Sequence, residues 1–123
     1  MENSETYIAF LKNNGRPLSE INPGSDETAL TVNQALEALE LLRVSTSPIV
    51  GGDVLSEENG RLVYAYQSWG SEYHCLNWSC NKEPNETQTE YAIRSYVFAK
   101  KSIKTASEVA TRLSKNCFIV FVT

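Results

Sequence analysis

The stretch SPIVGGDVLSEENGRLVYAY, residues 47–66, decides the fold of this 123-residue chain. Its two apolar, β-branched runs predict two strands on either side of Asn59-Gly60, a dipeptide that favours the positive backbone angles of a tight hairpin turn. Gly51-Gly52 interrupts the first strand and predicts a kink or bulge, with Asp53 either bonded to the amides of that bulge or engaged in binding. We therefore expect an antiparallel hairpin.

The segments after this hairpin extend the sheet. Trp69-Gly70-Ser71 predicts a second turn, and the aromatic, alternating segment from Glu72 to Ser79 predicts the third strand of a meander. The apolar run from Cys117 to Val122 predicts a last strand that is buried on both faces and inserted beside the meander. The expected fold is α+β: a small antiparallel or mixed sheet, made of the meander plus this C-terminal strand, packed with about four helices.

Capping residues mark where the helices begin. A capping box of Thr and Glu or Gln predicts the start of three of them, at Thr31, Thr87 and Thr105. Ser4 is the expected cap of a first, short helix that ends at Asn13-Asn14-Gly15. The turn residues between Leu18 and Glu27 predict a loop.

Composition favours one globular domain over residues 1–123, because 41% of the residues are hydrophobic and 21% are charged. Glu2 and Glu5 do not fit a secretory signal, and no apolar run reaches the length that crosses a membrane. Three cysteines cannot all pair, so we expect free thiols in a cytoplasmic protein, with a Cys75–Cys80 bridge as the alternative.

The net charge of −4 is unevenly distributed along the chain. Residues 53–90 hold 7 acids and 2 bases, whereas residues 91–123 hold 1 acid and 6 bases. An acidic surface repels nucleic acid and attracts basic proteins, although a solvated charged face with no partner is the commoner explanation of such a bias. The acidic middle of the chain is therefore the first place to look for a protein-binding surface.

No residue pattern indicates an enzyme, a metal site or a cofactor. His74 is the only histidine, and as a strand neighbour of Cys75 it is expected to point to the opposite face. Gly51-Gly52-Asp53 lacks the Gly-Lys-Ser/Thr of a phosphate-binding loop. Tyr64, Tyr66, Trp69, Tyr73 and Trp78 form an aromatic group denser than a small core needs, and partly exposed aromatic residues beside acids are typical of protein interfaces.

Four blocks of the sequence, taken in order, resemble the immunity protein 40 family. They are Ala29-Leu30-Thr31, the run from Pro48 to Val54, Asn77-Trp78-Ser79-Cys80, and Tyr91 with Arg94-Ser95 and Ala99. The resemblance covers roughly Leu18 to the last strand. One departure is Trp69-Gly70-Ser71, which adds a turn and a second tryptophan. Either Trp69 or Trp78 could hold the family position, and Trp78 is preferred because its neighbours Asn77 and Cys80 match.

The resemblance implies a cytoplasmic protein of bacterial polymorphic toxin or contact-dependent inhibition systems. Such a protein binds the C-terminal effector domain of its cognate toxin and blocks it without chemistry of its own, and needs no nucleic acid, membrane, metal or cofactor. If the toxin is a nuclease, its basic substrate groove would complement the acids in the middle of this chain. We expect the toxin to contact Asp53, Glu57, Glu58, Trp69, Glu72, Tyr73 and Trp78.

Two other functions stay open at this point. The first is a nucleic-acid-binding or regulatory module that uses the basic residues Arg94, Lys100, Lys101, Lys104, Arg112 and Lys115. The second is a small enzyme that uses Asp53, His74 or a cysteine.

Overall fold

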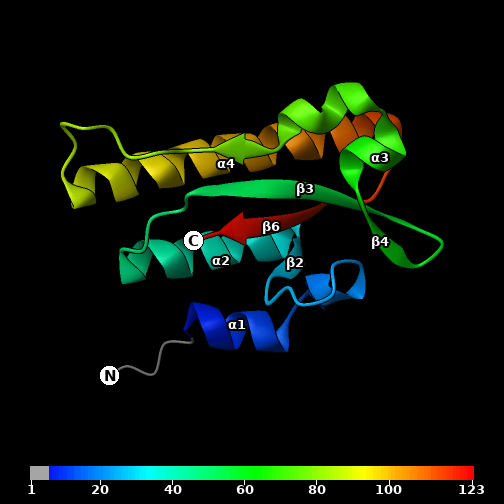
Figure 1. Cartoon of the computed structure of the whole chain (residues 1–123), viewed down its shortest axis with the longest axis horizontal. Helices are drawn as coiled ribbons and strands as arrows, with labels where there is room; N and C mark the ends of the chain where they lie inside the picture. The colour runs from blue at the N-terminus through cyan, green and yellow to red at the C-terminus, as the bar shows by residue number, and fades with distance from the viewer. Residues whose placement is uncertain (1–5) are drawn as a thin grey trace.

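The computed structural model describes residues 6–123, and Figure 1 shows the path of the chain through them. Within this range six short strands form one antiparallel sheet, and the two long helices, α2 (Val32–Ser45) and α4 (Gln88–Leu113), pack on one face of it. The strands are β1 (Arg16–Pro17), β2 (Thr28–Thr31), β3 (Gly51–Glu58), β4 (Arg61–Tyr64), β5 (Trp78–Ser79) and β6 (Phe118–Val122). The predicted α+β fold is confirmed.

The last strand of the chain lies inside the sheet. The strand order is β1-β2-β6-β3-β4, with β5 also paired to β3, on the edge that β4 occupies further along. On β6, Ile119 and Phe121 face the helices, and Val120 belongs to a second cluster on the opposite face. The prediction of an inserted strand buried on both faces is therefore confirmed.

The hairpin predicted at Asn59-Gly60 is present. Asn59 and Gly60 have φ of 53° and 81°, and Glu58 pairs with Arg61 across the turn. The kink or bulge predicted at Gly51-Gly52 is absent, because Gly51 pairs with Val122 and Gly52 with Phe121 in continuous register. Just before β3, Val50 also donates its N–H to the Val122 carbonyl, at 2.8 Å.

The predicted third strand of the meander is wrong. After β4 the chain forms a short helix, α3 (Ala65–Trp69), then a 3-10 segment, η2 (Ser71–Leu76), before the two residues of β5. Ala65 and Trp69, four residues apart, both pack against the helix-side core. Ala65 and Trp69 thus contact the core with helical spacing, which a short alternating pattern does not distinguish from a strand.

Three other predictions need correction. The short strand β2 was not predicted at all; its Leu30 pairs with Ile119. The two helices expected from Thr87 and Thr105 are one, α4: Thr105 lies inside it and donates its hydroxyl to the Lys101 carbonyl, at 3.0 Å. The first helix, α1 (Tyr7–Asn13), is capped by Thr6, and Ser4 lies outside the described residues.

The loop predicted from Leu18 to Glu27 contains a 3-10 turn, η1 (Leu18–Glu20), which covers the second face of the sheet. Leu18 is buried there, and the Glu20 carboxylate accepts a hydrogen bond from Leu62 N–H of β4, at 2.9 Å. Arg16 binds Glu20, Glu57 and the Gly60 carbonyl. These contacts close the outer edge of β4.

Candidate functional site

The sequence blocks that carry the family resemblance meet around the beginning of β3. A Cβ atom on Gly52 would overlap the indole ring of Trp78, and one on Gly51 would overlap the Trp78 carbonyl. Asn77 Oδ1 accepts a hydrogen bond from Val54 N–H, at 2.7 Å, in the gap where neither β4 nor β5 pairs with β3. The glycines thus provide the space for β5.

Gly52 itself does not need to be glycine for its backbone conformation. Its φ is not positive, and it pairs in regular register with Phe121. The requirement for glycine is steric, because the Trp78 ring lies where a side chain would be.

The block on α4 reaches the same region. Ser95 Oγ accepts a hydrogen bond from Ile49 N–H, at 3.0 Å, and the Tyr91 hydroxyl donates to the Cys80 carbonyl, at 2.7 Å. Arg94 donates to the Glu86 carboxylate and to the Asn81 carbonyl, both at 2.7 Å. These residues attach α4 and β5 to β3, so they account for the fold and do not by themselves locate a binding surface.

Asp53 lies on the other face of β3. Strand alternation places it with Leu55, away from α2 and α4. Its half-buried carboxylate has no hydrogen bond or ion pair within residues 6–123. Burial raises the pKa of Asp53, and the charge of His74 lowers that pKa in part. Burial also raises the pKa of half-buried Glu27, and the charges of Asp53 and Asp26 raise it further.

Tyr64 lies near both carboxylates and His74 lies near Asp53. The rings of Tyr64 and Tyr66 stack with centroids 5.9 Å apart, and Tyr66 meets His74 edge-on at 4.7 Å. Burial raises the pKa of Tyr64, with a further contribution from the nearby Asp53. We call this surface, made of Glu27, Asp53, Tyr64, Tyr66 and His74, the acid–tyrosine face. Both tyrosines are half-buried and His74 is exposed.

Glu57 and Glu58, two of the residues predicted to bind the toxin, already have partners. Glu57 forms an ion pair with Arg16 and accepts a hydrogen bond from Asn116 Nδ2, at 3.1 Å. Glu58 accepts a hydrogen bond from Ser68 Oγ, at 2.5 Å. Their carboxylates therefore hold neighbouring segments to the hairpin, besides contributing negative charge to the surface.

Trp69, Glu72 and Tyr73 lie in and beside α3 and η2. Trp69 packs at the edge of the helix-side core and meets the Tyr73 ring edge-on, with centroids 6.1 Å apart. Glu72 is exposed. Both Trp69 and Trp78 have a buried indole N–H that finds no acceptor within the described part of the chain.

Trp78 is separated from Asp53 by the sheet. It meets Phe121 edge-on on the helix side, with centroids 6.4 Å apart, and lines a groove of about 360 Å³ together with Leu76, Phe98 and Lys101. The residues predicted as one site therefore fall on two sides of the molecule. Glu27 and Tyr64, which the prediction missed, lie close enough to Asp53 for its charge to raise their pKa values; only the general aromatic excess pointed to Tyr64.

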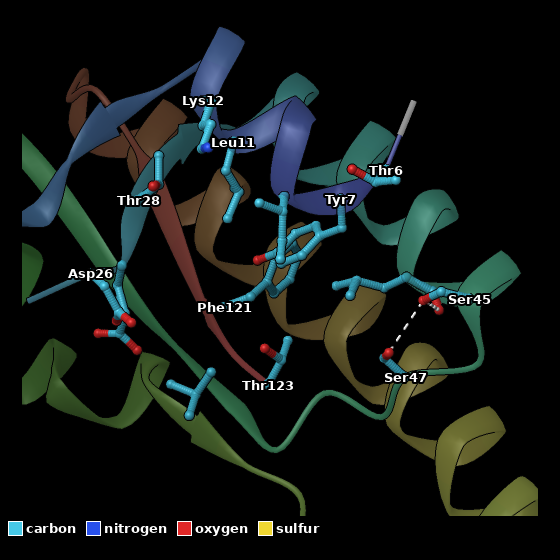
Figure 2. A pocket seen from close by; sticks show the side chains of 14 residues that line it. Thr6, Tyr7, Leu11, Lys12, Asp26, Thr28, Ser45, Ser47, Phe121 and Thr123 are labelled. Carbon is cyan, nitrogen blue, oxygen red and sulfur yellow. Dashed lines mark hydrogen bonds between the residues drawn. The ribbon is translucent and has the colours of Figure 1, made fainter. Parts of the chain in front are cut away.

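A larger hollow of about 740 Å³ lies where β2 and β6 diverge. Figure 2 shows Tyr7 and Leu11 of α1 above Phe121, with Asp26 and Thr28 on one side and Ser45 and Ser47 on the other. Burial raises the pKa of Tyr7 to about 12. The only histidine, His74, lies elsewhere, so the serine hydroxyls here have no imidazole base beside them.

The arrangement of the side chains also bears on metal binding, membrane insertion and cysteine chemistry. Within residues 6–123, no three His, Cys, Asp or Glu side chains are placed to hold a metal ion, and no helix is long and apolar enough to span a membrane. The three cysteines are unpaired. His74 and Cys75 lie in the 3-10 segment η2, so the expectation that they alternate along a strand is wrong.

The basic residues of the last third are divided among different roles. Arg94 is bound to Glu86, whereas Lys100, Lys101 and Lys104 are exposed on α4. Glu90 and Glu108 are exposed on the same helix. The helix therefore does not present a purely basic surface.

Comparison with known proteins places these observations in a family. The profile described as "Immunity protein 40" matches residues 17–123, nearly the whole chain. Neither the curated proteins nor the solved structures give a significant match. The match spans every strand from β2 to β6 and both long helices. The chain therefore belongs to the immunity protein 40 family.

Proposed function

We propose that this protein is a cytoplasmic, single-domain immunity protein that neutralises its cognate toxin by binding, without catalysis, through the acid–tyrosine face. Membership of the family implies a protein that protects against a toxin. The proposed mechanism is stoichiometric: the toxin's functional surface is covered while the complex lasts. Glu57, Glu58, Glu72 and Tyr73 would extend the contact around the hairpin and η2.

The observation that carries this proposal is the state of Asp53 and Glu27. Both carboxylates are half-buried, both have raised pKa values, and neither forms a hydrogen bond or ion pair through its side chain in residues 6–123. A carboxylate that has lost water without gaining a partner is unfavourable in the isolated protein. A lysine or arginine of the toxin would supply the missing partner.

The tyrosines would supply the contact area. Tyr64 and Tyr66 form a stacked pair beside the acids, and Tyr is among the residues that dominate binding energy at interfaces. A face of this kind fits a basic, partly apolar surface. The substrate groove of a nuclease has that chemistry, and we propose a nuclease as the toxin on this ground.

Asp53→Asn and Tyr66→Ala separate binding from folding. Asp53→Asn removes a desolvated charge, so the unfolding midpoint at neutral pH should stay the same or rise while affinity for the toxin domain falls. Tyr66→Ala should accelerate dissociation and cost about 2 kcal/mol of binding free energy. Surface plasmon resonance with the toxin domain encoded beside this gene, and growth rescue on co-expression, measure both effects.

The matched controls are Glu37→Gln and Val44→Ala on α2, which change an exposed acid and an exposed apolar residue away from this face. Both should bind as the unmodified protein does. If Asp53→Asn and Tyr66→Ala also bind normally, while reversing the charges of Lys100, Lys101 and Lys104 abolishes the complex, the toxin is held by α4 and the proposed face is wrong.

A further inference from the structure

The outer side of α4 carries apolar residues that nothing in residues 6–123 covers. Ile93 and Val97 are 58% and 66% exposed, near the middle of a 26-residue helix whose other side is buried against α2 and the sheet. Over residues 90–104 they form one line with three exposed charged residues, and exposed Glu108 continues this line towards the end of α4. We call this line, made of Glu90, Ile93, Val97, Lys101 and Lys104, the outer ridge.

The residues of the outer ridge are symmetrically spaced. Its residues are separated by three, four, four and three positions, so the spacing is symmetric about Val97. Spacings of three and four place side chains on one face of a helix. Its ends carry opposite charges, with Glu90 seven residues before Val97 and Lys104 seven residues after it.

We infer that the outer ridge is the contact of a homodimer, in which two copies pair their α4 helices antiparallel about Val97. A two-fold contact requires that a residue and its counterpart exchange roles between the two copies. With Val97 on the axis, Glu90 of each copy lies opposite Lys104 of the other. The same alignment sets Ile93 against the aliphatic stem of Lys101.

Charge complementarity favours a second copy over an unrelated partner of uniform charge. A basic partner surface would match Glu90 and repel Lys101 and Lys104, and an acidic surface would do the reverse. An antiparallel second helix matches both ends of the outer ridge at once and opposes the two helix dipoles. Because the apolar contact is small, the dimer should be weak and depend on concentration.

The test is the oligomeric state of the full chain, measured by sedimentation equilibrium over a wide concentration range. Val97→Asp should raise the dimer dissociation constant about tenfold or more, because it places two carboxylates on the axis. Val44→Asp is the matched control, since Val44 is 74% exposed on α2, and it should dimerise as the unmodified protein does. Lys104→Glu should also weaken the dimer, and Glu90→Gln, which keeps the helix cap, should restore part of the loss.

Disulfide capture gives a second readout that does not depend on affinity. In a Cys75→Ser background, which removes the exposed thiol, Val97→Cys should form a covalent dimer under mild oxidation, and Val44→Cys should not. A protein that stays monomeric at every concentration, with no capture at position 97, would overturn the inference. So would a dimer that Val97→Asp leaves intact. If Val97→Asp instead weakens only the toxin complex, the outer ridge is a toxin contact and not a dimer contact.

Discussion

At the scale of single residues, Gly52 shows how the identity of one side chain depends on a distant one. The indole of Trp78 occupies the space that any Cβ at position 52 would need. Gly52→Ala should therefore lower the free energy of unfolding by about 1–3 kcal/mol, the usual cost of overpacking a core. The urea midpoint measures this change, and an unchanged midpoint would remove the packing explanation.

A second substitution tests whether the clash is with Trp78. Trp78→Leu destabilises by itself, because it removes a large ring from the edge of the core. The double variant Gly52→Ala/Trp78→Leu should, however, lose less free energy of unfolding than the sum of the losses of the two single variants. Strict additivity would mean that the two positions do not interact.

At the scale of elements, the side chain of Asn77 accepts a hydrogen bond that a neighbouring strand would otherwise accept. It accepts the Val54 N–H at the point of β3 where β4 has ended and β5 has not begun. Asn77→Ala should cost about 1–3 kcal/mol, because it leaves a buried amide without an acceptor. Asn77→Asp keeps an acceptor of the same shape, so it should cost much less. Equal losses for Ala and Asp in thermal unfolding would contradict this role.

The elements also show where sequence reasoning succeeds and where it stops. Asn59-Gly60 and the capping box at Thr31 act through their own backbone, and both predictions are confirmed. Thr105 has the same local pattern as a cap, but Ile103 and Ala106 are buried on either side of it, so packing keeps the helix continuous. No local signal marks β2, which pairs with β1 and β6, and β5 is only the last two residues of a segment predicted to be a longer strand.

At the scale of the whole molecule, a few ionic contacts determine how the protein responds to acid. The carboxylate of Glu86 has its pKa lowered to about 2, because Arg94 donates hydrogen bonds to it. A carboxyl group with a lowered pKa in the folded state stabilises the fold above its ordinary pKa of 4.5. That contribution is lost as the pH falls from there towards 2. Asp53 and Glu27 have raised pKa values, so their protonation favours the folded state.

We therefore expect Glu86→Gln to flatten the loss of stability below pH 4.5, compared with the unmodified protein. Urea unfolding followed at a series of pH values measures the slope. Glu37→Gln, on the exposed side of α2, should leave the slope unchanged. If Glu86→Gln behaves as Glu37→Gln does, the contact with Arg94 contributes nothing to the acid response.

The candidate site was less predictable than the fold because its residues are far apart in sequence and come together only when the sheet forms. Asp53 was identified from the acidic bias of the middle of the chain, but Glu27 comes from the position just before β2, and His74 from η2. The two tryptophans looked like interface anchors, yet both pack at the edge of the core. A residue pattern shows which side chains are unusual, and tertiary contacts decide which of them face outward.

The Glu20 carboxylate that covers the edge of β4 also bears on how the protein survives at high concentration. An uncovered edge strand offers its amides to the edge of another molecule, which is the first step of cross-β aggregation. Here the cover is a carboxylate whose pKa is lowered by its hydrogen bonds to Leu62 and Arg16. Strong acid would protonate it and weaken the cover. Fibrils seeded from β4, rather than simple unfolding, are then the form of damage to watch for in acid.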